Sequence, residues 1–228
     1  MGGAKEYYDL LLHELYTARI EWRLYRSLFG TNKETVDLLN EISGLTAQTL
    51  ERVLFERTLL NLRKLTDPYE KQRGKHLSVT TKGLSRYFDC SDNTLRKLVN
   101  QAERAASFAR DWSNKRIAHS DLDYKARKAK LEKASRAAVE DALTSIADVL
   151  KWVAHEHFDT TLVTHPIPPL DDERRFLKAL YLGKSEMERV SGKKQLLLEQ
   201  RRYAELDEFR AVSEIPDWLV RKNPPIDV

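Results

Sequence analysis

The chain has 228 residues, of which 41% are hydrophobic and 32% charged, with a formal net charge of +4. This composition is typical of a helix-rich globular protein with one core and an appendage, or with two small domains. No apolar run approaches the roughly 20 residues that a bilayer requires, so we expect no membrane-spanning segment. The first residues, MGGAKEYYDLLLHEL, lack the features of a signal peptide, and the single cysteine, Cys90, suits a reducing cytoplasm.

The positive charge is concentrated in one part of the chain. Residues 61–135 hold 18 Lys and Arg against 9 Asp and Glu, whereas the stretches on either side are slightly acidic. A basic surface of this kind favours a polyanionic partner such as nucleic acid. A helical protein with well-solvated lysine-rich faces would show the same balance, so both interpretations stay open.

The first 65 residues show three helical patterns. A 3-4 spacing of apolar residues predicts a helix over residues 4–29, ended by Gly30, with a stripe that faces the core rather than forming a base-stacking platform. The sequence Thr31-Asn-Lys-Glu34 is a capping box and predicts the start of a second helix. We expect a bend around Gly44 and a third helix over residues 45–65.

The middle of the chain contains a loop, a short helix and a long helix. Residues 67–76 are polar and basic and predict an exposed loop, and residues 78–88 predict one short helix. Residues 91–123 contain no Gly or Pro and begin at the N-cap candidate Ser91, so they predict one long helix. Its stripe consists of Leu95, Leu98, Ala102, Ala105, Ala109 and Trp112, followed by Arg116 and His119.

The last third of the chain predicts further helices around an extended connection. Residues 136–157 show a helical pattern, and the prolines and β-branched residues of 157–170 argue for an extended link. No segment alternates like a strand, so the fold class is all-α. The expected domains are a helical bundle over 1–157, a proline-containing linker over 158–170, a helical extension over 171–212 and a tail over 213–228.

Metal and phosphate-loop motifs find little support in the residue spacing. His155 and His157 would point about 160° apart on a helix, which is typical of a surface helix end. Asp171, Asp172 and Glu173 suit the positive end of a helix. The chain has no HExxH motif and no Walker loop, so we expect neither a metal nor a cofactor.

Arg116 and His119 end the apolar stripe of residues 91–123. A histidine on an apolar face is often a hydrogen-bonded core residue, and an arginine beside it can be its structural partner, so that interpretation stays open. Cleavage of RNA without a metal needs a group that exchanges a proton near neutral pH and a cation that holds the phosphate. His119 and Arg116 are residues of those two types, and Asn114 is close by.

The segment SNKRIAHSDLD at 113–123 resembles the motif of the HEPN superfamily. It is most similar to the branch named after abortive-infection (phage-resistance) proteins of the U type. LYRSLFG at 24–30, VDLLN at 36–40 and LRKLTDP at 62–68 resemble the same branch, in the same order. The resemblance covers about residues 5–157 and extends more loosely to about residue 210.

This resemblance implies an antiparallel helical bundle that pairs into a homodimer, with the Arg and His of both protomers facing a composite cleft. Many members are metal-independent endoribonucleases in which the 2′-hydroxyl attacks the neighbouring phosphate. For this chain it implies His119 as general acid or base, Arg116 as the phosphate clamp and Asn114 as the orienting residue. RNA is the expected partner, together with an antitoxin or another defence-system protein, in the cytoplasm.

The family pattern places an arginine four to six residues before the histidine and a polar residue straight after that arginine. Here Asn114 fits the polar position, but Ser113 occupies that of the arginine. A catalytically degenerate protein that binds nucleic acid or a partner without cleaving is therefore the alternative, and a purely structural helical dimer is a third. The residues expected to guide RNA are Arg110, Lys115, Lys125, Arg127 and Lys128.

Overall fold

The structure is a computed structural model of the whole chain. It describes residues 2–71, 76–89, 93–117, 122–126, 128, 130–165, 172–212 and 219. The chain divides into two compact units, Met1–Glu173 and Arg174–Val228, and each is described by itself.

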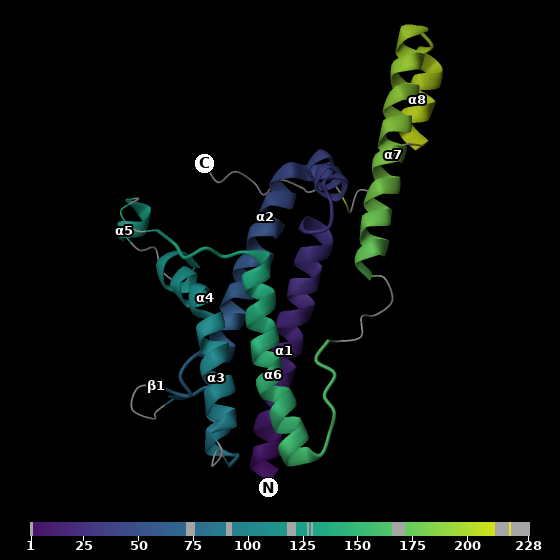
Figure 1. The fold of residues 1–228 in the computed structure, drawn as a ribbon. Coiled ribbons are helices and arrows are strands. Elements are labelled where there is room, and N and C mark those ends of the chain that lie inside the picture. Colours follow the sequence, from purple (N-terminus) through teal and green to yellow (C-terminus); the bar gives the residue numbers. More distant parts are fainter. Residues whose placement is uncertain are drawn as a thin grey trace. The chain divides into compact units, whose positions relative to one another are not determined.

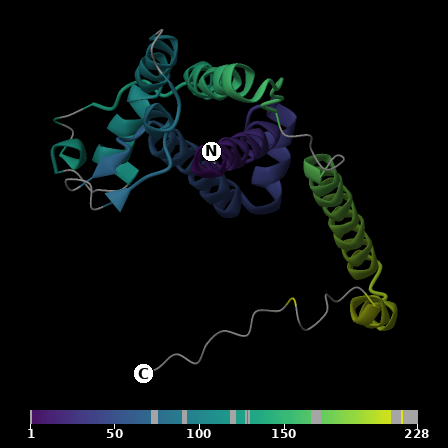
Figure 2. The ribbon, with the colours of Figure 1, turned by 90° about the horizontal axis from the view of Figure 1, so that it is seen from below.

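The first unit is built around four helices: α1 (Gly2–Phe29), α2 (Lys33–Thr66), α3 (Thr94–Ala105) and α6 (Arg136–Phe158). Successive helices of this set run in opposite directions, and all four lie side by side (Figures 1 and 2). α1 packs mainly against α2, and α3 packs mainly against α6. The expected all-α class is confirmed.

The predicted first helix is confirmed, and its apolar stripe lies in the core of the first unit. Leu11, Leu15 and Ala18 are fully buried, and Trp22 is nearly so. Burial of a leucine side chain of this kind stabilises the fold by roughly 1.5–3 kcal/mol. The Trp22 indole N–H donates to Oε1 of Glu140 on α6 at 2.8 Å, so the polar edge of this large ring is satisfied as well.

The entry to α2 differs by one residue from the predicted capping box. Asn32 is the N-cap, and its side-chain oxygen accepts a hydrogen bond from the Thr35 amide at 2.8 Å. The Thr31 hydroxyl instead donates to the carbonyl of Arg26 and so closes the end of α1. The predicted bend near Gly44 is present at Ser43, whose backbone leaves helical geometry at φ −163° and ψ 87°.

The prediction of one long helix over residues 91–123 is wrong. α3 ends at Ala105, α4 covers Ser107–Trp112, and η2 (Ser113–Ile117) is a π-helical turn. α3 packs against α6, whereas α4 and η2 pack against α2, so the helix changes partner at Ala106. Neither a Gly nor a Pro marks this break, which therefore could not be read from the pattern. Ser91, the expected N-cap, lies outside the described residues.

The expected loop at 67–76 contains two short antiparallel strands, β1 (Glu70–Lys71) and β2 (His76–Leu77). The short helix expected over 78–88 is the 3-10 helix η1 (Thr81–Arg86). Tyr7 of α1 anchors the start of η1. Its hydroxyl accepts a hydrogen bond from the Thr80 amide at 2.8 Å and donates one to the Thr80 carbonyl at 2.9 Å. Burial raises the pKa of the Tyr7 hydroxyl above its ordinary value.

The chain after α6 returns along α1 without regular secondary structure as far as residue 165, as the predicted extended link requires. The Tyr16 hydroxyl donates to the carbonyl of Val163 at 2.7 Å. Nη1 of the buried Arg19 lies 2.8 Å from Nε2 of His165. These contacts attach the 159–165 segment to the outer face of α1.

The remaining described helices are α5 (Leu122–Lys125), α7 (Asp172–Glu199) and α8 (Tyr203–Val212). α7 runs through Gly192 without a break, and its first two residues fall in the first unit. In the second unit Leu197 and Leu206 are buried, and Arg201 turns the chain with φ 55°. None of the helices described has the length and apolar character needed to cross a membrane.

We expect Gly83→Ala to destabilise the protein by about 1–3 kcal/mol, because overpacking of a well-filled site has a cost of that size. A Cβ at residue 83 would overlap the Tyr7 hydroxyl and lie 2.5 Å from Cδ2 of Tyr69. Chemical denaturation measures the change. The control is Gly44→Ala, where a Cβ would meet nothing within 4 Å. Equal stabilities for the two variants would contradict the packing assigned to Tyr7.

We expect the pKa of His165 to lie below its ordinary value, because the neighbouring Arg19 cation disfavours the imidazolium and burial adds to this effect. The fold therefore favours neutral His165, and its contribution to stability is lost as the pH falls below about 6.5 through the lowered pKa. Arg19→Met should raise the pKa in an NMR titration of the histidine rings. Arg57→Met, which removes a guanidinium paired with Glu21, is the control. An unchanged His165 titration in Arg19→Met would refute the assignment.

Candidate functional site

The segment that carries the predicted site follows α4 as the π-helical turn η2. π-helical turns are rare and frequently occur at functional sites. η2 packs against α2, and α4 lies beyond the end of α3 in Figure 1. Within η2 Ser113 is fully buried, whereas Asn114 and Arg116 are exposed residues. The turn thus presents two of the predicted site residues at the surface of the first unit.

Arg116 is held at this surface by two contacts. Its Nε lies 3.2 Å from Oε1 of Glu56 on α2, and its guanidinium carbon lies 5.2 Å from the centre of the Trp112 ring. A cation over an indole face is attracted by the ring quadrupole, and the carboxylate adds an ion pair. The Arg116 side chain nevertheless remains 36% exposed, so an incoming anion can reach it.

A pocket of 530 Å³ lies beside Arg116, between α1, α2 and α4. Phe55 and Trp112 pack nearly perpendicular to each other with ring centres 5.7 Å apart, and Tyr25 packs against Phe55 at 5.5 Å. Glu56 and a second arginine, Arg52, also line the pocket. Aromatic faces stack on flat rings such as nucleobases, and guanidinium groups bind phosphates. The pocket therefore offers both kinds of contact that a nucleotide unit needs.

Ser113, which occupies the position of the family arginine, has a structural contact of its own. Its hydroxyl accepts a hydrogen bond from Nη1 of Arg63 on α2 at 2.5 Å, and Nε of Arg63 lies 3.7 Å from Asp67. A guanidinium is therefore present beside residue 113, but it comes from another helix. Sequence reasoning missed Arg63, although it lies within the LRKLTDP stretch, because no local spacing links positions 50 residues apart.

Two of the basic residues expected to guide RNA are engaged within the protein. Nη1 of Arg110 lies 3.2 Å from Glu103, and its Nη2 donates to the Thr66 carbonyl at 3.0 Å. A hydrogen bond from Lys82 lowers the pKa of the Glu103 carboxyl, and Arg110 lowers it further, while burial opposes both. Glu103 thus remains ionised and anchors Arg110. Lys115 pairs with Asp111 at 2.5 Å.

The other predicted residues are placed less fully. Lys128 is exposed, and Lys125 belongs to α5. His119 and Arg127 lie outside the described residues. The structure therefore brings Arg116 together with Trp112 and Glu56, and it places Arg110 in a separate cluster with Asp67 and Glu103.

The two histidines considered for metal binding make other contacts. Nδ1 of His155 lies 2.9 Å from the neighbouring Glu156, and the ring of His157 packs against Phe88 at 4.8 Å. Over the ranges that the structure describes, no three His, Cys, Asp or Glu side chains are grouped so that they could hold a metal ion.

Comparison with protein families matches residues 1–176 to the family model HEPN_AbiU2 (AbiU2). The matched range includes the four-helix bundle and residues 113–119. Comparisons with curated proteins and with solved structures find no significant match. The match extends over well more than half of the 228 residues and confirms the family expected from the 113–123 motif. The chain belongs to the AbiU2 family of HEPN abortive-infection proteins.

Proposed function

We propose that this protein is a metal-independent endoribonuclease that acts in abortive infection. The observation that supports this most directly is Arg116, which is held on an aromatic-lined pocket within a few residues of the family histidine. A pocket with stacking faces and a guanidinium at its edge suits a nucleobase and its phosphate. The family membership adds the reaction type expected of its HEPN relatives.

The proposed reaction needs no group beyond the RNA and the side chains. The 2′-oxygen forms a bond to phosphorus while the bond from phosphorus to the 5′-oxygen breaks. One proton leaves the 2′-hydroxyl and another reaches the departing 5′-oxygen. His119 exchanges one of these protons, because an imidazole titrates near neutral pH. Arg116 stabilises the charge on the phosphate oxygens, and Asn114 orients the group.

Arg116 must exchange partners during this reaction. In the unbound protein its Nε contacts the Glu56 carboxylate at 3.2 Å, and a phosphate would compete with Glu56 for that guanidinium. The exchange costs little free energy, because a partly exposed ion pair stabilises a protein by only about 0–1 kcal/mol. Glu56 therefore acts as a resting counter-charge that also keeps the guanidinium over Trp112.

The proposed active form is a homodimer. The part of α2 that follows the bend at Ser43 carries Glu56 and also exposes Leu45 at 78% and Val53 at 51% of their surfaces. Exposed apolar side chains on a helix that also lines the aromatic pocket favour a protein interface here. A second copy packed here would bring two Arg116 side chains and two His119 side chains to one cleft, which would then hold both a proton acceptor and a proton donor.

A non-catalytic RNA-binding protein is the second candidate. It is favoured by Ser113, which is buried and hydrogen-bonded to Arg63, where the family pattern has an arginine. In that case the aromatic pocket and Arg116 would bind RNA without cleaving it. The same pocket supports either function, so only an assay for products separates the two.

Purified protein is expected to cleave RNA in the presence of EDTA. His119→Ala should lower the rate by about 10²–10⁴-fold, because it removes a proton-transfer group. Arg116→Ala should lower it by about 10²–10³-fold, because it removes a charge-stabilising donor. Gel analysis of a labelled RNA measures both rates.

The matched control is Lys5→Ala, which removes a cation paired with Asp9 at the far end of α1. Light scattering of the same preparations should give the mass of two chains. Binding of RNA without any product would establish the second candidate instead. Full cleavage by His119→Ala would refute the assignment of that residue.

Glu56→Gln is expected to tighten RNA binding about two- to fivefold, since it frees Arg116 from an ion pair of modest strength. Fluorescence anisotropy with a labelled RNA measures the affinity, and the gain should shrink at high salt. Glu21→Gln removes the same charge from the pair with Arg57 and serves as the control. If both variants change the affinity equally, the effect reflects net charge and not the release of Arg116.

A further inference from the structure

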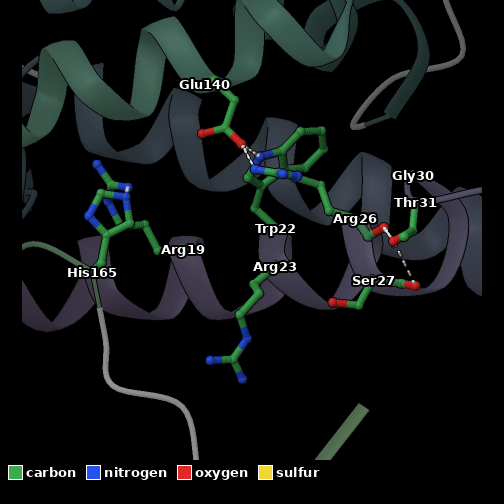
Figure 3. Close-up of a pocket in the computed structure, with 9 residues that line it drawn as sticks. All are labelled: Arg19, Trp22, Arg23, Arg26, Ser27, Gly30, Thr31, Glu140 and His165. Carbon is green, nitrogen blue, oxygen red and sulfur yellow. Dashed lines mark hydrogen bonds and ion pairs between the residues drawn. The ribbon is translucent and has the colours of Figure 1, made fainter. Parts of the chain in front are cut away.

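A second pocket, of 470 Å³, lies on α1 and is lined by three arginines, Arg19, Arg23 and Arg26. These residues follow the i, i+4, i+7 spacing that places side chains on one helix face. Figure 3 shows Trp22 and Arg26 converging on Glu140, Arg19 beside His165, and Arg23 extending away from them. Every lining residue belongs to the first unit, and the pocket shares no lining residue with the one beside Arg116.

Two guanidinium nitrogens at this pocket have no hydrogen-bond partner within the described part of the protein. They are Nε of Arg19 and Nη1 of Arg23, and both are buried from solvent. A buried charged donor without a partner is costly, and most buried donors in folded proteins are paired. Both nitrogens belong to side chains that line the pocket, so a rotation of either guanidinium would present an unpaired donor to a ligand oxygen and remove this cost.

The positive charge at the pocket exceeds the nearby negative charge. Arg26 pairs with Glu140 at 2.6 Å, and Nε of Arg23 pairs with Glu173 at 2.8 Å. Among the described residues no carboxylate pairs with Arg19: its Nη1 contacts His165 and its Nη2 donates to the Leu143 carbonyl at 3.3 Å. Asp148, which also influences Arg19, is itself paired with Lys151 at 3.1 Å. The three arginines that line the pocket are thus balanced by two carboxylates, Glu140 and Glu173.

We infer that this pocket binds the phosphate group of a small phosphorylated molecule or free inorganic phosphate. A phosphate dianion carries several acceptor oxygens, and guanidinium groups bind it through parallel N–H donors. The volume is within the range of small-molecule sites and leaves room for an organic group next to the phosphate. The Ser27 hydroxyl and the Trp22 ring line the rest of the cavity. This inference does not depend on the proposed ribonuclease activity.

Isothermal titration calorimetry of the full chain at about pH 7.5, where phosphate is mostly dianionic, tests the inference. The probes are inorganic phosphate, AMP and adenosine in a chloride buffer. Phosphate and AMP are expected to bind, and adenosine is not. AMP binding at least about tenfold tighter than phosphate would assign a phosphorylated organic ligand, and equal affinities would assign free phosphate.

Two variants locate the binding. Arg23→Gln should weaken it by about tenfold or more, because it removes a charged donor. Ser27→Leu should also block binding by filling the cavity. This variant keeps all three arginines, and leucine is compatible with the helix because of its high helix propensity. Arg57→Gln removes a guanidinium elsewhere in the bundle and should bind like the parent protein. Circular dichroism checks that each variant is folded.

The inference is overturned if neither phosphate nor AMP binds up to about 10 mM, a concentration that would detect even millimolar affinity. It is also overturned if adenosine binds as tightly as AMP. Parent-like affinities in folded Arg23→Gln and Ser27→Leu would place the binding elsewhere and refute the site.

Discussion

The packing of Trp112 against α2 is the contact on which the candidate site depends. Its ring packs nearly perpendicular to that of Phe55, the Arg116 guanidinium lies over it, and its indole N–H donates to the Glu132 carbonyl at 2.8 Å. The neighbouring Asp111 accepts from the amide of Glu132 at 2.9 Å. Asp111 and Trp112 therefore both hold Glu132, which lies shortly before the start of α6. The same tryptophan orients Arg116, so core packing and the candidate chemistry share one residue.

Ion pairs within the protein reduce the positive charge that is available to a polyanionic partner. Lys82, Arg86, Arg110 and Lys115 all belong to the positive stretch, and each pairs with a carboxylate. These pairs cancel part of the positive field that a count of charges suggests. Arg116 is paired too, but its partner Glu56 lies on an aromatic pocket that can accept a ligand. In the proposed function, binding of RNA here would be a competition between the Glu56 carboxylate and a phosphate for the Arg116 guanidinium.

α1 lies between two pockets of different chemistry. Trp22 lines the arginine pocket and Tyr25 lines the pocket beside Arg116, and their rings stack at 5.0 Å with an interplanar angle of 10°. Both rings belong to the apolar stripe, so residues that look like core by their spacing also form the walls of both cavities. Each pocket also receives a carboxylate from another helix, Glu140 on α6 in the arginine pocket and Glu56 on α2 in the pocket beside Arg116.

Local sequence determined the helices, because apolar spacing and end signals act within a few residues. Local sequence predicted the apolar stripe of α1, the bend near Gly44, the helix over 136–157 and the 113–123 motif. Tertiary structure decided the features that join distant positions. It divided the expected long helix at Ala106, where the partner changes from α6 to α2, and it widened residues 113–117 into a π-helical turn. It also paired Arg63 with Ser113 and gathered Arg19 with His165. These pairs are 50 and 146 residues apart along the chain, so only the folded arrangement of the helices could bring them together.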